Sequence, residues 1–455
     1  MDPCACGTVE PRPANRAEPT RRALLAHAGA LGLLAACAPG ASGTAGTGAT
    51  QARALSGTVQ ILANSVFPFH DDVGGQIARD FMARHPGVRV ESQPLTGSAV
   101  DKITAAVAGG DAPELVSLGI HEVQTLAANN AIRPLDEYLK SSKDLKTSDV
   151  WPTLLQDVTY KGKVYGIPYG PDLRILYVSV DKYLGAGLDV SKPPRTWAEF
   201  EQNIARTHRG RGSEIETLGF DPFLGSGGIY RWMVPYWQLG GELVSPDRER
   251  VTINNEKAIE ALTWLKKVVD SQGGYEAILA FERGTTYQQL FMDNKVAHMY
   301  ATYAERAQEF AIKAPQFRFS FFPYPLPPNG RKANYGGGHT FPILHSSRNP
   351  DAAWAFLDFL SLEENNVRFT DRYDRIPLRM RTVRSEKWHR NDPFRKLAAD
   401  EMEGRRFVIS APGGAEALPF QGNFVTEIML NRKSIREGLA EAQAQIQQVL
   451  DKWKR

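Results

Sequence analysis

The stretch from Tyr160 to Phe200 constrains the fold of this 455-residue chain more than any other. In it, turn-forming glycines and prolines are followed by a predicted strand and then by the start of a predicted helix. Lys161-Gly162 lies between short apolar pieces and predicts a β-hairpin. Glycine and proline then interrupt the chain repeatedly, and the apolar run Leu173–Val180 is short enough to be a buried strand. Thr196 and Glu199 have the spacing of a capping box, so a helix is predicted to begin there.

Strands and amphipathic helices alternate along the rest of the chain. Gly57–Ala63 predicts a strand, and Asn255–Asp270 and Ser434–Trp453 predict helices whose apolar residues recur on one face. This alternation favours an α/β fold with mostly parallel sheets. Such sheets bind ligands at the mouth of a crossing strand, and Tyr169 and Asp172 lie just before a predicted strand.

The N-terminal segment has the pattern of an export and anchoring signal. Arg21-Arg22 form a twin-arginine pattern ahead of the apolar run Ala23–Ala36, which is too short to cross a bilayer. The run ends at Cys37, and the Leu-Ala-Ala that precedes this cysteine resembles a lipobox. We therefore expect a signal peptide over residues 1–36, and a lipidated Cys37 on a flexible tether that extends to residue 55. A cytosolic protein with a disordered alanine-rich leader is the alternative.

Cysteine usage and charge exclude several classes of protein. The three cysteines are Cys4, Cys6 and Cys37, so removal of the signal peptide would leave only Cys37 and no disulfide framework. The formal net charge is +3, with lysine and arginine scattered along the chain, so no nucleic-acid partner is expected. After residue 55, no apolar run approaches the length of a membrane-spanning helix.

Enzyme motifs are scarce. The chain lacks a Walker A loop, an HExxH motif, a G-x-S-x-G elbow and a dinucleotide fingerprint. Ser179 and Lys182 satisfy S-x-x-K without its companion motifs, and His70-Asp71-Asp72 has no second ligand cluster. We therefore expect no catalytic residue, no metal site and no cofactor. A pair of glycosidase carboxylates is neither indicated nor excluded, because their separation in space is not encoded by spacing.

A second set of residues has the chemistry of a sugar site. Sugars present hydroxyl groups around apolar C–H faces, so their sites combine flat aromatic rings with carboxylates, amides and backbone groups. Glycines, which lack a side chain, let a ligand approach the main chain closely. The candidate ligand-binding residues in turn-rich places are Tyr169, Asp172, Tyr230, Trp232, Tyr303, Gly337, Gly338 and His339. Packing in a core is the alternative for each ring, and it is the expected role of Trp197, Trp237, Trp264 and Trp354.

Three segments in the middle of the chain carry a family resemblance. The sequences GKVYGIPYG, LYVSVDKYLGAGL and PPRTWAEF resemble the extracellular solute-binding proteins of carbohydrate ABC transporters, which include the maltose-binding type. The segments GGDAPELVSLG and LDEYL extend the resemblance toward the N-terminus. Four positions depart from the family pattern: Glu114 stands where the family usually has aspartate, Ser179 where it has asparagine, and His298 where it has methionine. Asn294 takes the place of a turn glycine, and asparagine tolerates the left-handed conformation that such a turn needs.

The resemblance implies a periplasmic-binding type II fold with two lobes and a hinged cleft between them. Both lobes would be discontinuous in sequence. The expected first lobe covers residues 56–170 and 304–362, and the expected second lobe covers residues 171–303 and 363–455. The chain would then pass from one lobe to the other near Gly170–Leu173, near Tyr303–Glu305 and after Leu360.

The resemblance also implies a function. The chain would be the substrate-binding lipoprotein of an ABC importer, a monomer anchored outside the cytoplasm that passes a sugar or oligosaccharide to a permease and its ATPase. It would not be an enzyme. Two rivals stay open: a receptor for a non-sugar solute such as a phosphorylated polyol, a polyamine or a metal chelate, and a secreted carbohydrate-active enzyme. An anionic ligand stays open as an alternative, because a phosphate needs two or more positive donors and the chain offers Arg174, Arg231 and His339.

Overall fold

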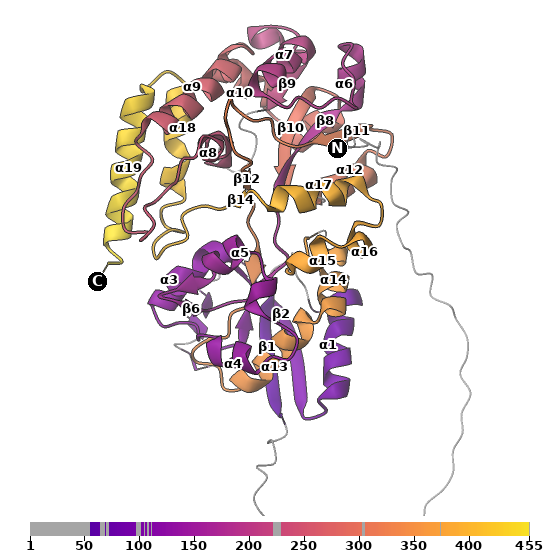
Figure 1. Cartoon of the computed structure of the whole chain (residues 1–455), viewed down its shortest axis with the longest axis vertical. Helices are drawn as coiled ribbons and strands as arrows, with labels where there is room; N and C mark the ends of the chain where they lie inside the picture. Colours follow the sequence, from indigo (N-terminus) through magenta and orange to yellow (C-terminus); the bar gives the residue numbers. More distant parts are fainter. Residues whose placement is uncertain are drawn as a thin grey trace, which may run out of the picture. The chain divides into compact units, whose positions relative to one another are not determined.

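A computed structural model describes residues 55–454, except for residues 64–68, 70–71, 97–101, 104, 107–108, 111, 222–228, 303–304 and 374 (Figure 1). The expected signal peptide, the lipidated Cys37 and most of the tether lie outside the described residues, as do His70 and Asp71. Within the described ranges, no helix combines the length and the apolar character of a membrane span.

The first lobe is built on a parallel sheet. Strand β1 (Gly57–Ala63) lies between β2 (Val88–Pro94) and β3 (Leu115–Val116) and pairs in parallel with both. Helices α1 (Asp72–Arg84), α13 (Pro350–Ser361) and α14 (Glu363–Arg372) pack together beside this sheet. Aromatic rings contribute to this packing: the rings of Phe81 in α1 and Phe356 in α13 lie 5.3 Å apart, and Phe69, which precedes α1, lies 5.3 Å from Phe369 in α14.

A small antiparallel sheet joins distant parts of the chain within the same lobe. Strand β13 (His339–Thr340) pairs with β4 (Leu118–Gly119) and with β7 (Pro168–Tyr169). The predicted hairpin is confirmed as β5 (Thr159–Tyr160) and β6 (Lys163–Val164). Its turn needs positive φ angles, which Lys161 and Gly162 supply at 46° and 76°. The helices of this region are α3 (Val123–Ala128), α4 (Asp136–Ser141) and α5 (Pro152–Asp157).

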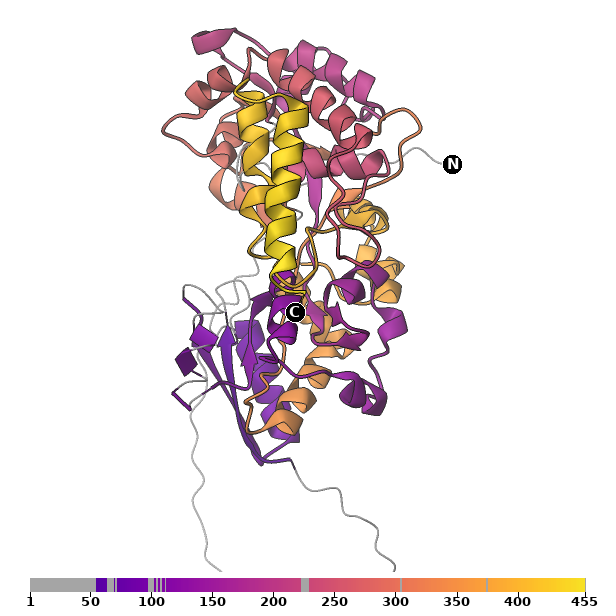
Figure 2. The ribbon, with the colours of Figure 1, turned by 90° about the vertical axis from the view of Figure 1, so that its left-hand side faces the viewer.

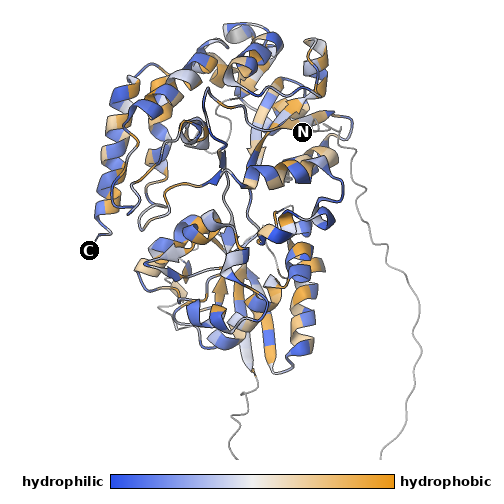
Figure 3. Ribbon diagram, in the orientation of Figure 1, coloured by the Kyte–Doolittle hydropathy of each residue, from blue (hydrophilic) through white to orange (hydrophobic). Residues whose placement is uncertain are grey.

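The second lobe has a mixed sheet. Its strand order is β11 (Phe319–Phe322), β8 (Arg174–Ser179), β10 (Val296–Thr302) and β9 (Leu218–Asp221). Strand β8 is antiparallel to both of its neighbours, and only β10 and β9 are parallel, so the expectation of mostly parallel sheets is wrong for this lobe. The predicted strand is confirmed, because residues 175–179 of β8 are all buried. Figure 3 shows the strands of this sheet as largely hydrophobic.

Helices of the second lobe follow local sequence signals. Helix α7 (Trp197–Thr207) begins at the predicted capping box of Thr196 and Glu199. Helix α9 (Glu256–Asp270) is capped by Asn255, and α19 (Ile435–Asp451) has a second capping box. Figure 2 shows α19 beside α18 (Asn423–Met429), against which it packs. The remaining elements are α6 (Val180–Gly185), α8 (Ile229–Gln238), α10 (Tyr275–Glu282), α11 (Tyr287–Met292), α12 (Glu305–Lys313), β12 (Asn334–Tyr335), α15 (Met380–Val383), α16 (Glu386–His389), α17 (Pro393–Met402) and β14 (Arg405–Arg406).

Strand pairing moves two of the expected lobe boundaries. The change of lobe expected at Tyr303–Glu305 is wrong, because α12 packs on β10 and β11 pairs with β8 in the second sheet. The chain changes lobe instead between β12 and β13, since β12 pairs with β14 while β13 joins the small sheet of the first lobe. The expected boundary at residue 363 falls too early, because α14 packs on α1 and α13. A four-residue apolar strand such as β11 fits the edge of either sheet, so local pattern could not assign it.

Candidate functional site

Three segments meet where the chain passes between the lobes. The backbone N–H of Asp172 donates to the carbonyl of Gly337 at 3.4 Å, and the N–H of Ile376 donates to the carbonyl of Pro171 at 3.0 Å. These contacts bring together a set of polar and aromatic side chains that we call the crossing cluster, which consists of Asp172, Arg174, Tyr230, Tyr335, His339 and Arg375.

Asp172 is the electrostatic centre of the crossing cluster. Its Oδ1 lies 3.2 Å from Arg174 Nη1 and accepts the backbone N–H of Gly337 at 2.8 Å, while its Oδ2 lies 4.0 Å from Arg375 Nη1. Burial by itself raises the pKa of this carboxyl, but Arg174, Arg375 and the Gly337 N–H together outweigh burial and hold the pKa below its usual value. Asp172 is therefore ionised at neutral pH.

Two adjacent aromatic rings lie against the Arg174 guanidinium. Its central carbon lies 5.3 Å from the ring centre of Tyr230 and 5.2 Å from that of Tyr335, and the two rings are 4.7 Å apart. Phe407 extends the row at 5.7 Å from Tyr335 and 6.2 Å from the His121 ring. The site therefore combines aromatic faces with a charged, hydrogen-bonding centre, which is the chemistry that a sugar ring requires.

The glycine run keeps the main chain close to these groups. A Cβ on Gly336 would lie 2.5 Å from the carbonyl oxygen of Asp172 and 2.9 Å from Arg405 Cγ, so a larger residue does not fit there. A Cβ on Gly337 would lie 3.2 Å from Phe407 Cε2. The glycines therefore let the segment around residue 337 approach both the crossing strand and Phe407.

His339 of the crossing cluster and the nearby His121 are both neutral. The pKa of His339 is lowered to about 4, chiefly by burial and also by Arg375, while Asp172 acts in the opposite direction. Burial likewise lowers the pKa of His121 to about 4. At neutral pH both imidazoles can donate and accept hydrogen bonds without adding charge to the site.

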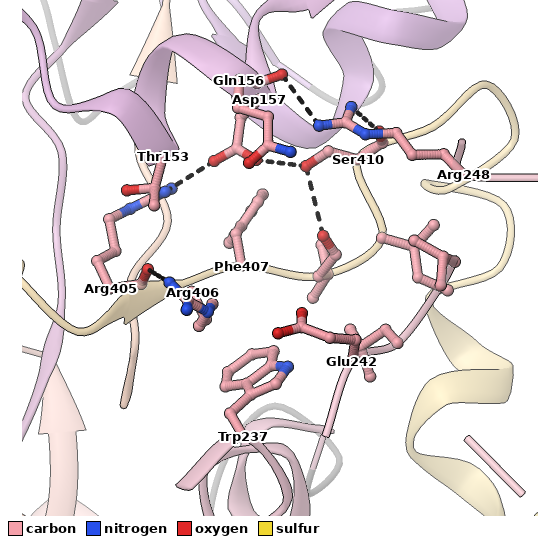
Figure 4. Close-up of a pocket in the computed structure, with 14 residues that line it drawn as sticks. Thr153, Gln156, Asp157, Trp237, Glu242, Arg248, Arg405, Arg406, Phe407 and Ser410 are labelled. Carbon is pink, nitrogen blue, oxygen red and sulfur yellow. Dashed lines mark hydrogen bonds and ion pairs between the residues drawn. The ribbon is translucent and has the colours of Figure 1, made fainter. Parts of the chain in front are cut away.

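A pocket of about 310 Å³ opens beside the crossing cluster, and we call it the inner pocket (Figure 4). Arg405 and Phe407 connect the two, because both line this pocket, Phe407 contacts Tyr335, and Arg405 donates to the carbonyl of Gly337 at 3.4 Å. Helix α5 of the first lobe lines the pocket with Thr153, Gln156 and Asp157. The second lobe supplies Trp237, Glu242, Leu243, Val244, Arg248 and residues 405–410.

Asp157 links the two sides of the inner pocket. Its Oδ2 lies 2.8 Å from Arg405 Nη1, and the Ser410 hydroxyl donates to its Oδ1 at 2.6 Å, as Figure 4 shows. Both partners come from the segment that follows α17, so a carboxylate of one lobe is held by the other. The inner pocket is therefore lined by both lobes and closed on one side by direct contacts between them.

Five of the eight predicted site residues come together in this region. Asp172, Tyr230 and His339 belong to the crossing cluster, and Gly337 and Gly338 form the backbone between them. Tyr303 lies outside the described residues.

Two predicted site residues are corrected. Tyr169 is fully buried in the first lobe, where its hydroxyl donates to the carbonyl of Leu357. Trp232 is fully buried in the second lobe, where its indole N–H donates to the carbonyl of Gln421 at 2.8 Å. The expectation that these two rings face a ligand is wrong, because both are packed inside their lobes and hydrogen-bonded to the main chain.

The core role expected of four other tryptophans is confirmed. Trp197 and Trp264 stack with ring centres 4.2 Å apart, and both are 6% exposed, as is Trp354. Trp237 is 1% exposed, and one edge of it lines the inner pocket.

Sequence reasoning missed several residues of the site. Tyr335 lies in the same glycine-rich segment as Gly337, and its position next to that run was a usable signal. No sequence motif marks Arg375, Arg405 or Phe407, and Asp157 only ends a short helix. These four residues are identified as part of the site by their neighbours in space. Within the described ranges, no group of three or more histidine, cysteine, aspartate or glutamate side chains is arranged to hold a metal ion.

Comparison with known proteins gives one family and several relatives. Residues 76–395 match the model of the family described as bacterial extracellular solute-binding protein. A binding protein of Brucella abortus is 23% identical over 378 residues, which is 83% of this chain and 89% of the relative. The maltooligosaccharide ABC transporter solute-binding lipoprotein of Streptococcus pneumoniae is 24% identical over 317 residues, which is 65% of this chain and 66% of the relative.

Solved structures agree with this match. The protein CpMnBP1 with mannotriose bound is 25% identical and superposes with a TM-score of 0.71, covering 86% of this chain and all of that one. These neighbours confirm the two-lobed α/β fold expected from the sequence.

Proposed function

Because this chain belongs to the family of bacterial extracellular solute-binding proteins, we propose that it captures a sugar or oligosaccharide between its lobes and delivers it to an ABC permease. The family and the structural neighbours are binding proteins. The protein itself would then make and break no covalent bond, and ATP would be hydrolysed by the partner of the permease. We propose that it acts as a monomer at the outer face of the cell membrane.

The observation that carries this proposal is the composition of the site between the lobes. An ionised carboxylate, a guanidinium that lies beside two adjacent tyrosine rings, and a glycine-lined backbone lie next to a pocket with both lobes in its wall. Rings match the apolar faces of a sugar, and Asp172 and the backbone match its hydroxyls. A ligand that touches both walls would favour the closed arrangement of the lobes, which is the form that a permease can distinguish from the open one.

A phosphorylated polyol is the second candidate ligand. Among the described residues of the crossing cluster, two guanidiniums, those of Arg174 and Arg375, face the single carboxylate of Asp172. A phosphate group binds where two positively charged donors converge, as these two guanidiniums do. The inner pocket also has one more guanidinium than carboxylates, since Arg248, Arg405 and Arg406 line it together with Asp157 and Glu242. The cluster alone favours neither ligand, whereas the aromatic row favours the sugar.

A panel of solutes tests this function. We expect maltose, maltotriose, mannobiose or mannotriose to raise the unfolding midpoint of the purified protein, because a ligand at one hundred times its dissociation constant stabilises the folded state by about 2.7 kcal/mol. The recovered sugar should be chemically intact by chromatography. A response to sn-glycerol 3-phosphate alone would favour the second candidate. Product that accumulates in proportion to protein would favour the enzyme rival.

Lipid anchoring is a separate part of the proposal and has its own test. Cys37 follows Leu-Ala-Ala at the end of the apolar run, and the related protein of Streptococcus pneumoniae is named a lipoprotein. We expect Cys37→Ala to move the protein from the membrane fraction to the soluble fraction, because the thioether lipid can no longer form. Cys6→Ala is the matched control and should leave the distribution unchanged. Membrane retention of the Cys37 variant would contradict the anchor.

A further inference from the structure

A second and larger cavity lies on the far side of the inner pocket. Its volume is about 900 Å³, and we call it the outer cavity. The first lobe lines it with α5 and the β5–β6 hairpin, including Leu155 and Tyr160. The second lobe lines it with residues 247–249, residues 411–412, Leu450 near the end of α19, and Trp453 and Lys454 just after that helix. In Figures 1 and 2 the C-terminal end of α19 accordingly lies beside the first lobe.

The two cavities share part of their walls. Gln156 and Arg248 line both of them. Arg248 donates to the carbonyl of Ser410 through Nη1 and to the carbonyl of Gln156 through Nη2 at 3.5 Å. Its side chain therefore stands at the boundary between the inner pocket and the outer cavity, in contact with both lobes.

The backbone of Arg248 supports a specific placement of this side chain. Its φ angle is 62°, a left-handed conformation that a residue other than glycine rarely adopts. The turn that holds it is closed by a hydrogen bond of 2.8 Å from Arg248 N to the Ser245 carbonyl. Such conformations persist where the surrounding structure enforces them, and they concentrate at functional sites.

The outer cavity has the lining of a sugar site. Trp453 and Tyr160 are both partly buried and come from different lobes. The Trp453 ring is held against Gly413, where a Cβ would lie 2.5 Å from its Cδ1. Polar side chains line the same cavity, among them Gln156, Asp247 and Glu249. Aromatic rings with amide and carboxylate groups beside them match sugar faces and sugar hydroxyls.

We propose that the outer cavity binds the distal units of an oligosaccharide whose first units occupy the inner pocket, with Arg248 contacting the ligand where it passes from one to the other. The inner pocket alone is at the lower end of the range of small-molecule sites, which runs from roughly 300 to 1,000 Å³. The outer cavity adds about 900 Å³. The preferred ligand is therefore an oligosaccharide and not a monosaccharide. This inference rests on the proposed capture of a carbohydrate.

Calorimetric titration of the full chain with a length series tests the inference. The probes are maltose to maltohexaose and mannobiose to mannohexaose. In the series that binds, we expect affinity to rise at least tenfold from the disaccharide to the pentasaccharide. Trp453→Ala should remove about tenfold from the affinity for the pentasaccharide and leave disaccharide affinity unchanged. Tyr160→Ala, on the other wall, should act in the same direction.

The control is Lys452→Ala, because Lys452 is exposed on the same chain end and lines neither cavity. Equal affinities for all lengths, unchanged by either aromatic variant, would overturn the outer cavity as a site and leave sugar capture intact. Failure of every sugar to bind would overturn both. If Trp453→Ala lowers the unfolding midpoint, the Tyr160→Ala result decides, since Tyr160 lies on a surface hairpin.

Discussion

Trp232→Ala should lower the free energy of unfolding by about 3–5 kcal/mol, the usual cost of removing a buried tryptophan. The ring is 0% exposed, lies 5.4 Å from the Tyr236 ring and 5.3 Å from the Phe424 ring, and donates its N–H to the Gln421 carbonyl. The substitution would leave a cavity and an unsatisfied carbonyl inside the second lobe. Urea denaturation measures the change, with the unfolding midpoint falling at constant slope.

Measuring sugar affinity distinguishes a packing role of Trp232 from a direct contact with the ligand. At temperatures where the variant is folded, we expect Trp232→Ala to bind the same sugar as the parent protein with unchanged affinity. Ile312→Ala is the matched control for stability, because the Ile312 side chain is 72% exposed and its loss should be nearly neutral. Normal melting of Trp232→Ala together with lost binding would place the ring in the ligand site and contradict the described packing.

Asp172→Asn should lower the free energy of unfolding by about 3–5 kcal/mol at pH 7, the range for breaking a buried ion pair by removing one partner. The variant keeps an acceptor for the Gly337 N–H but removes the negative charge that faces Arg174 and Arg375. The side chains of Asp172 and Arg174 are only 13% and 14% exposed, so water screens their interaction weakly. Glu137→Gln, which breaks an exposed pair with Lys140, is the control and should leave stability unchanged.

The pH dependence of this difference has a defined sign. The pKa of Asp172 is lowered in the folded protein, so its contribution is fully present above the unfolded pKa of about 3.9 and is lost as pH falls through the folded value. The difference in unfolding free energy between the parent and Asp172→Asn should stay constant from pH 7 down to about pH 4 and shrink below it. A difference that shrinks already near pH 6 would show that the effect comes from another group.

Several features of this protein follow from its sequence alone, because the physical cause lies within a few residues. The hairpin at Lys161-Gly162 and the helix that begins after Thr196 were predictable from turn and capping chemistry. Asn294 was expected to adopt a left-handed conformation in place of a glycine, and its φ angle is 57°. The family resemblance of the central segments likewise predicted the two-lobed fold, and Asp172, Tyr230 and the glycines before His339 lie together at the crossing between the lobes, where their contact with a ligand stays a prediction.

Only the tertiary structure decided which aromatic rings face the cleft and which segments belong to each lobe. Trp232 follows a glycine-rich stretch and Tyr335 precedes one, yet the Trp232 ring packs against Phe424 of α18 and the Tyr335 ring lies against Arg174. The pair of Asp157 and Arg405 joins residues that are far apart in the chain and share no motif. A side chain's exposure and its charge partners depend on the packing of whole elements, and spacing along the chain does not encode that packing.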